Sequence, residues 1–207
     1  MNKNLKHKVL MILDERRNVP SGVIKVADEI KNGSNSDINY EVLNLDIVIN
    51  RKINSYDKKK NNENFYIRLY KKLKIYLKQI MLLVNELLSN DFKSIIFHNG
   101  GIPGSLLITI SLLISNLLKP YSRKIMVIHN YPRKSSNFKI KIFNLFTKLS
   151  IKYFANKVVS VSYDCSLVLS DFLKKNVLTI HNGINTKLEL KNKKRSLYKR
   201  LLFVGEM

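Results

Sequence analysis

Cysteine is almost absent from this 207-residue sequence, which contains only Cys165. A single cysteine excludes an internal disulfide and is compatible with a reducing compartment such as the cytosol. The amino terminus also lacks the long apolar segment of a secretory signal peptide, because the basic start is followed only by the short run Val9 to Leu13. We therefore expect a cytoplasmic protein in which Cys165 belongs to the core.

Acidic residues are scarce: Asp and Glu number 15 against 37 Lys and Arg, and the formal net charge is +22. Such an excess favours a negatively charged partner, and the main classes are nucleic acid, an anionic membrane surface and phosphorylated small molecules. A compositional bias towards Lys, Asn and Ile gives the same excess without any partner. The charge alone does not choose among these.

No long apolar run is present either. The segment from Ser94 to Leu118 contains no charged residue, but turn-forming residues interrupt it between Asn99 and Gly104. A membrane-spanning helix needs about 20 consecutive apolar residues, so the segment indicates a strand, a turn and a buried helix instead.

What the sequence does contain is a set of short apolar runs that lack polar alternation, a pattern typical of parallel strands covered on both faces. Strands are expected at 8–13, 40–49, 94–99, 124–129, 157–161 and 177–180. Helices are expected from residue 22, at 65–88, 103–118, 137–155 and 164–173. The predicted fold class is α/β, with a Rossmann-like parallel sheet and helices on both faces.

Two of the expected helices are amphipathic. In helix 65–88 the apolar stripe is assigned to the core, and it consists of Leu69, Leu73, Tyr76, Ile80, Leu83, Val84 and Leu87. Helix 137–155 has an apolar side formed by Phe138, Ile142, Leu145, Phe146, Leu149 and Tyr153. A separate stripe holds Lys141, Lys148 and Lys152. Two interpretations of this helix remain: a packed helix with a solvated charged face, or a helix lying on an anionic membrane.

Three of the apolar runs end in a histidine followed by an asparagine: His98-Asn99, His129-Asn130 and His181-Asn182. Because the carboxyl ends of parallel strands share one edge, where ligands bind in open α/β sheets, this edge is the candidate site. Three histidines also raise the possibility of zinc. Their separate strands, and the absence of neighbouring carboxylates in the sequence, argue against a metal.

After the first strand, Pro20-Ser21-Gly22 opens a helix. A glycine at such a turn allows an anion to approach the backbone N–H groups, which suggests a phosphate contact, although a simple helix cap has the same pattern.

The domain boundaries are expected as follows. Residues 1–184 form one domain, the polar and basic stretch 185–200 resembles a linker, and 201–207 reads as the first strand of a truncated second domain.

Several motifs, in this order, resemble the amino-terminal half of a retaining glycosyltransferase of family 4, which has the two-domain GT-B fold. The motifs are Pro20-Ser21-Gly22, His129, Val158-Val159-Ser160-Val161-Ser162, Asn182-Gly183-Ile184-Asn185 and Phe203-Val204-Gly205. The resemblance implies hexosyl transfer from a nucleotide-sugar donor to a glycan or lipid-linked acceptor. It also implies no metal, and no cofactor beyond the nucleotide-sugar as co-substrate. The expected location is cytoplasmic, with peripheral attachment to the inner face of the membrane.

The resemblance further implies roles for individual residues. His129 would contact the transferred sugar near its reacting carbon, while Ser21 and Gly22 would approach the donor diphosphate. Asn182 and Gly183 would lie at the interdomain cleft. His98, Asn99 and Asn130 form the expected acceptor-side rim.

Two alternatives stay open. A nucleic-acid-binding module is compatible with the charge and the ten tyrosines, although no familiar motif of that class is present and no specific nucleic acid is expected. The second alternative is an inactive remnant that keeps the fold but not the activity.

Overall fold

In a computed structural model of the chain, the described residues are 7–14, 22–32, 38–45, 65–133 and 135–181. The strands are β1 (His7–Leu13), β2 (Ile38–Asn44), β3 (Ser94–Asn99), β4 (Arg123–Ile128), β5 (Lys157–Ser160) and β6 (Val177–Thr179). The helices are α1 (Gly22–Asn32), α2 (Phe65–Ser89), α3 (Leu106–Leu118), α4 (Phe138–Phe154) and α5 (Tyr163–Leu173). The expected linker and truncated second domain, residues 185–207, lie outside the described residues.

The strands form one parallel sheet in the order β2-β1-β3-β4-β5-β6. This confirms the predicted α/β class with an all-parallel, Rossmann-like sheet. Strand β2 begins two residues before the expected 40–49 segment and ends at Asn44. The chain moves from β1 outward to β2 and then returns to β3 on the other side of β1, so the point at which the strand order reverses lies between β1 and β3.

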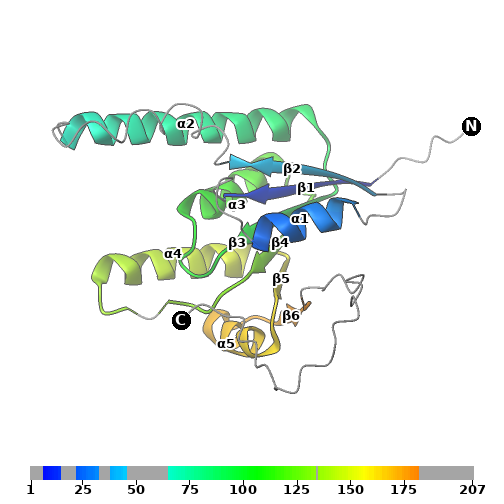
Figure 1. Cartoon of the computed structure of the whole chain (residues 1–207), viewed down its shortest axis with the longest axis vertical. Coiled ribbons are helices and arrows are strands. Elements are labelled where there is room, and N and C mark those ends of the chain that lie inside the picture. Colours follow the sequence, from blue (N-terminus) through cyan, green and yellow to red (C-terminus); the bar gives the residue numbers. More distant parts are fainter. Residues whose placement is uncertain (1–6, 15–21, 33–37, 46–64, 134, 182–207) are drawn as a thin grey trace, which may run out of the picture.

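The order of the strands explains which helices cover which face (Figure 1). Crossovers between parallel strands are right-handed, so a helix changes face when the direction of strand addition changes. Accordingly α1 packs on one face around Ala27, Met11 and Leu13. Helices α2, α3, α4 and α5 contribute to the larger core on the other face, which also contains the buried Cys165. The prediction of helices on both faces is confirmed.

The predicted core stripe of α2 is only partly correct. Leu83 and Leu87 are buried, but Leu69, Leu73 and Tyr76 are 45–57 % exposed. The reason is length: the 25 residues of α2 extend over about 37 Å, whereas a strand of seven residues extends over about 23 Å. The amino-terminal part of α2 therefore projects beyond the carboxyl ends of β1 and β2 (Figure 1).

The packed-helix interpretation of α4 is wrong about the apolar side. Every residue of that predicted side is exposed, and the buried residues of α4 are Thr147, Ser150 and Ile151. None of the helices among the described residues has both the length and the apolar character needed to cross a bilayer.

Candidate active site

Two histidines meet at the carboxyl edge of the sheet. The register of β3 and β4 places His98 opposite Val127 and Asn99 opposite Ile128, and the His129 backbone N–H donates to the Asn99 carbonyl at 3.1 Å. Two-residue alternation then puts both imidazoles on the face of the sheet that α1 covers. His98 Nδ1 and His129 Nε2 are 3.3 Å apart, and the rings stack with centroids 5.6 Å apart. The structure thus joins two of the three predicted His-Asn pairs.

Burial keeps this pair uncharged at neutral pH. It lowers the pKa of His98 to about 4, with a further contribution from the neighbouring His129, and burial also lowers the pKa of His129. In a neutral pair, one imidazole nitrogen donates to the other. The tautomer of His98 therefore decides whether the second nitrogen of His129, Nδ1, is a hydrogen-bond donor or an acceptor. His129 is only partly buried, so Nδ1 is the atom of the pair best placed to meet a ligand.

The loop after β3 brings further polar groups to the same edge. Its Ile102–Pro103 peptide is cis, and the Asn99 side-chain oxygen accepts from the Ser105 backbone N–H at 3.0 Å. Ser105 caps α3 and donates its hydroxyl to the carboxylate of Asp14, which follows β1. This contact joins the carboxyl ends of β1 and β3, where the strand order reverses. Sequence reasoning missed Asp14, although the rule that selected the histidines, a polar residue directly after a buried strand, would have found it.

Three polar atoms at the same edge are buried and have no hydrogen-bond partner among the described residues. They are His98 Nε2, Asn99 Nδ2 and Ser160 Oγ, at the ends of β3 and β5. Two-residue alternation puts His98 on the α1 face of the sheet, and Asn99 and Ser160 on the opposite face. Buried polar atoms are nearly always paired with protein, water or ligand, so each face offers a position for water or a ligand at this edge.

The remaining predicted residues are dispersed or lie outside the described part of the chain. Asn130 is exposed, and His181 is exposed just beyond the edge strand β6. Gly22 is the first residue of α1, which starts on the carboxyl side of the sheet because it follows β1. Ser21, Asn182 and Gly183 lie outside the described residues.

Gly104 allows the loop to carry these contacts, and we predict that Gly104→Ala destabilises the protein. Its φ of +58° is in the left-handed region, and a Cβ there would lie 1.9 Å from the Asn99 side-chain oxygen. The left-handed backbone alone costs an alanine about 1–2 kcal/mol. Urea unfolding should show at least this loss, whereas Gly100→Ala, where a Cβ would meet nothing within 4 Å, should remain close to the parent. Equal stability of the two variants would contradict the prediction.

A groove runs from His98 across the sheet face beside α1, and His129 is not part of its lining. Its volume is about 540 Å³, and His98 and His181 both line it. The rest of its lining is mainly aliphatic, including Ile30, Ile96, Ile125, Val127, Val159 and Leu178. His98, whose Nε2 atom has no hydrogen-bond partner among the described residues, thus lines an apolar groove.

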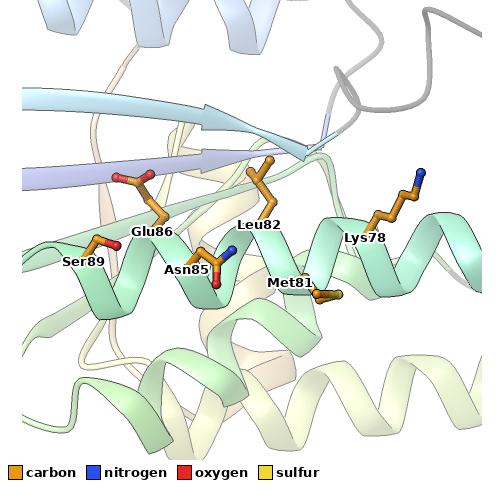
Figure 2. Close-up of a pocket in the computed structure, with 6 residues that line it drawn as sticks. All are labelled: Lys78, Met81, Leu82, Asn85, Glu86 and Ser89. Carbon is orange, nitrogen blue, oxygen red and sulfur yellow. The ribbon is translucent and has the colours of Figure 1, made fainter.

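A second hollow lies elsewhere, on α2 (Figure 2). Its volume is about 470 Å³, and it is lined by Lys78, Met81, Leu82, Asn85, Glu86 and Ser89, all from one helix. The end of α2 lies near the start of β1, since Lys8 Nζ donates to Asn90 Oδ1 at 2.9 Å. This hollow therefore lies towards the amino ends of the strands, away from His129.

The described residues contain no group of three His, Cys, Asp or Glu side chains that could hold a metal ion. Comparison of the sequence with protein-family models and with curated proteins gives no match, so what is established for this chain is its six-stranded parallel α/β fold.

Proposed function

We propose that this chain provides the acceptor-side domain of a retaining glycosyltransferase, which transfers a hexosyl group from a nucleotide-sugar to a glycan or lipid-linked acceptor. The observation that carries the proposal is the neutral His98–His129 pair at the carboxyl edge of a parallel sheet. It stands one strand away from the point where the strand order reverses, which is where open α/β sheets bind ligands. The order of the sequence motifs supplies the reaction class.

The charge state of His129 suits this reaction. Sugar transfer develops positive charge at the reacting carbon, and a protonated imidazole beside that carbon would repel it. Burial lowers the pKa of His129, so its neutral ring can hydrogen-bond a sugar hydroxyl without this repulsion. His98 acts through His129, because its Nδ1 contact fixes the ring orientation and the tautomer.

Two further groups support a ligand at this edge. α1 begins at Gly22, and the first backbone N–H groups of a helix have no partner within the helix, which suits the diphosphate of a nucleotide-sugar. The Asp14 carboxylate, which accepts from the Ser105 hydroxyl, suits an acceptor hydroxyl group.

The proposal is tested with a panel of radiolabelled nucleotide-sugars and a membrane extract as acceptor. Under this proposal the chain supplies one wall of a two-domain cleft, and positioning of both substrates can contribute about 7–11 kcal/mol to such a reaction. We therefore expect no turnover from the 207-residue chain alone. A chimera that joins residues 1–184 to the donor domain of a retaining two-domain transferase should be active.

Two outcomes would contradict this. Turnover by the chain alone would show that a second domain is not required. A chimera whose donor domain binds nucleotide-sugar but gives no transfer to any acceptor would remove the proposed function. Salt-sensitive DNA binding by that inactive chimera would favour the nucleic-acid alternative.

A further inference from the structure

The outer surface of α4 is apolar. Eight large apolar side chains of this helix are between 38 % and 74 % exposed: Phe138, Ile142, Phe143, Leu145, Phe146, Leu149, Tyr153 and Phe154. We call this set the α4 outer face. Single exposed apolar residues are ordinary on protein surfaces, but eight on one helix, six of which share one side, mark an interaction surface.

The inner surface of α4 explains why these residues are not needed for the core. Asn144 Nδ2 donates to the Arg133 carbonyl at 2.9 Å, and the Thr147 hydroxyl donates to the Pro103 carbonyl at 3.3 Å. Near the end of the helix, Asn116 of α3 donates to the Phe154 carbonyl at 3.1 Å. Polar contacts therefore fix α4 against its neighbours, and rotating the helix to bury the outer face would break them.

The charge on α4 restricts the class of partner. The helix contains Lys139, Lys141, Lys148 and Lys152 and no acidic residue, within a chain of formal net charge +22. The Lys152 ammonium lies 5.6 Å from the ring of Tyr153, so charge and apolar surface are adjacent. A second copy of the chain would bring like charges together, which is unfavourable. The surface instead suits a partner that has an apolar interior and an anionic surface.

We infer that α4 lies in the interfacial layer of an anionic lipid bilayer, with the α4 outer face inserted and its lysines at the headgroups. Amphipathic helices with aromatic residues and lysines bind bilayers in this way, and the lysines add attraction to anionic lipid. The helix would lie on the bilayer and would not cross it, since α4 has only 17 residues and four of them are lysines. The apolar residues supply the insertion.

This inference goes beyond the proposed function and does not depend on it, since binding to vesicles needs neither donor nor acceptor. Its consequence for the site is geometric. The first turns of α4 project beyond the carboxyl ends of β1 and β2 (Figure 1), so the inserted helix would hold the edge that carries His129 near the bilayer surface.

The experiment is sedimentation of the full chain with vesicles of phosphatidylcholine, alone or with about 30 % phosphatidylglycerol. We expect strong binding only to the anionic vesicles. The double variant Phe138→Ser with Ile142→Ser should bind the anionic vesicles with an affinity reduced by about tenfold or more. Both side chains are exposed by half or more, so circular dichroism and thermal unfolding should match the parent.

The matched control is Leu117→Ser with Tyr121→Ser, which also removes two exposed large apolar side chains, 82 % and 99 % exposed, but outside the α4 outer face. It should bind like the parent. A second variant, Lys139→Gln with Lys141→Gln, should lose the preference for anionic vesicles while keeping the fold.

Three results would overturn the inference. The first is equal vesicle binding by the parent and the Phe138/Ile142 variant. The second is a dimer in sedimentation equilibrium that this variant abolishes, which would make the α4 outer face a contact between copies. The third is DNA binding that excludes vesicles from the same face.

Discussion

Replacing His129 with alanine should lower kcat/KM for sugar transfer by about a hundredfold or more, measured in the chimera that carries a donor domain. A hundredfold loss corresponds to about 2.7 kcal/mol of transition-state stabilisation. The expected cause is the loss of the neutral imidazole that contacts the sugar. Because His129 is partly exposed at the strand end, its removal should change the unfolding temperature little.

The control for this variant is His181→Ala. His181 is a histidine at the same edge of the sheet, but it is exposed beyond β6 and stacks on no partner ring among the described residues. Its removal should leave transfer unchanged. Activity of His129→Ala within about twofold of the parent, which is only about 0.4 kcal/mol, would end the catalytic assignment.

Acid should destabilise the protein through His98. The pKa of this residue is about 4 in the folded chain and 6.5 ordinarily, so between these values the unfolded chain binds protons that the folded chain does not. Stability is therefore fully present above about pH 7 and is lost as the pH falls through that window. From pH 7 to pH 4.5 the loss from His98 alone is about 2 kcal/mol. The lowered pKa of His129 acts in the same direction.

Urea unfolding at the two pH values measures this loss, and His98→Leu isolates it. Leucine removes the titrating group and the buried nitrogen that has no partner, so this variant should show a smaller acid loss. It also removes the contact to His129 Nε2, so some stability is lost at pH 7 as well. If His98→Leu loses as much stability as the parent between pH 7 and pH 4.5, the burial of His98 is not what makes the fold acid-sensitive.

Much of the fold could be predicted because buried parallel strands leave a simple signal. The apolar runs at 94–99 and 124–129 agree with β3 and β4 within one residue. These strands lie inside the sheet, so their side chains are apolar on both faces and the run is uninterrupted. The orientation of α4 could not be predicted. Periodicity shows that a helix has two sides, but the choice between them depends on partners such as Pro103 and Arg133, which are brought to it by the tertiary fold.

The candidate site divides in the same way. His98 and His129 could be predicted as site residues because each stands at the end of an apolar run, and parallel strands share one carboxyl edge. That their rings touch depends on the register of β3 against β4, which no local pattern specifies. The contact between Ser105 and Asp14 joins residues 91 positions apart and is made by the chain reversal, so it was beyond sequence reasoning.

The position of β1 between β2 and β3 also governs how the chain can assemble during synthesis. Strands β3, β4 and β5 each pair with the next strand along the chain, and β1 pairs with β2, but the second partner of β1 is β3, which begins at Ser94. At a synthesis rate of about 5–20 residues per second, β1 spends roughly 4–16 seconds outside the ribosome before this partner exists. For most of that time Leu10 and Ile12, which the finished core encloses, lack α2, which ends at Ser89, and for all of it they lack α3, which follows β3. We therefore expect the amino-terminal segment to be open to chaperone capture during synthesis, and the closing of its long loop to slow folding.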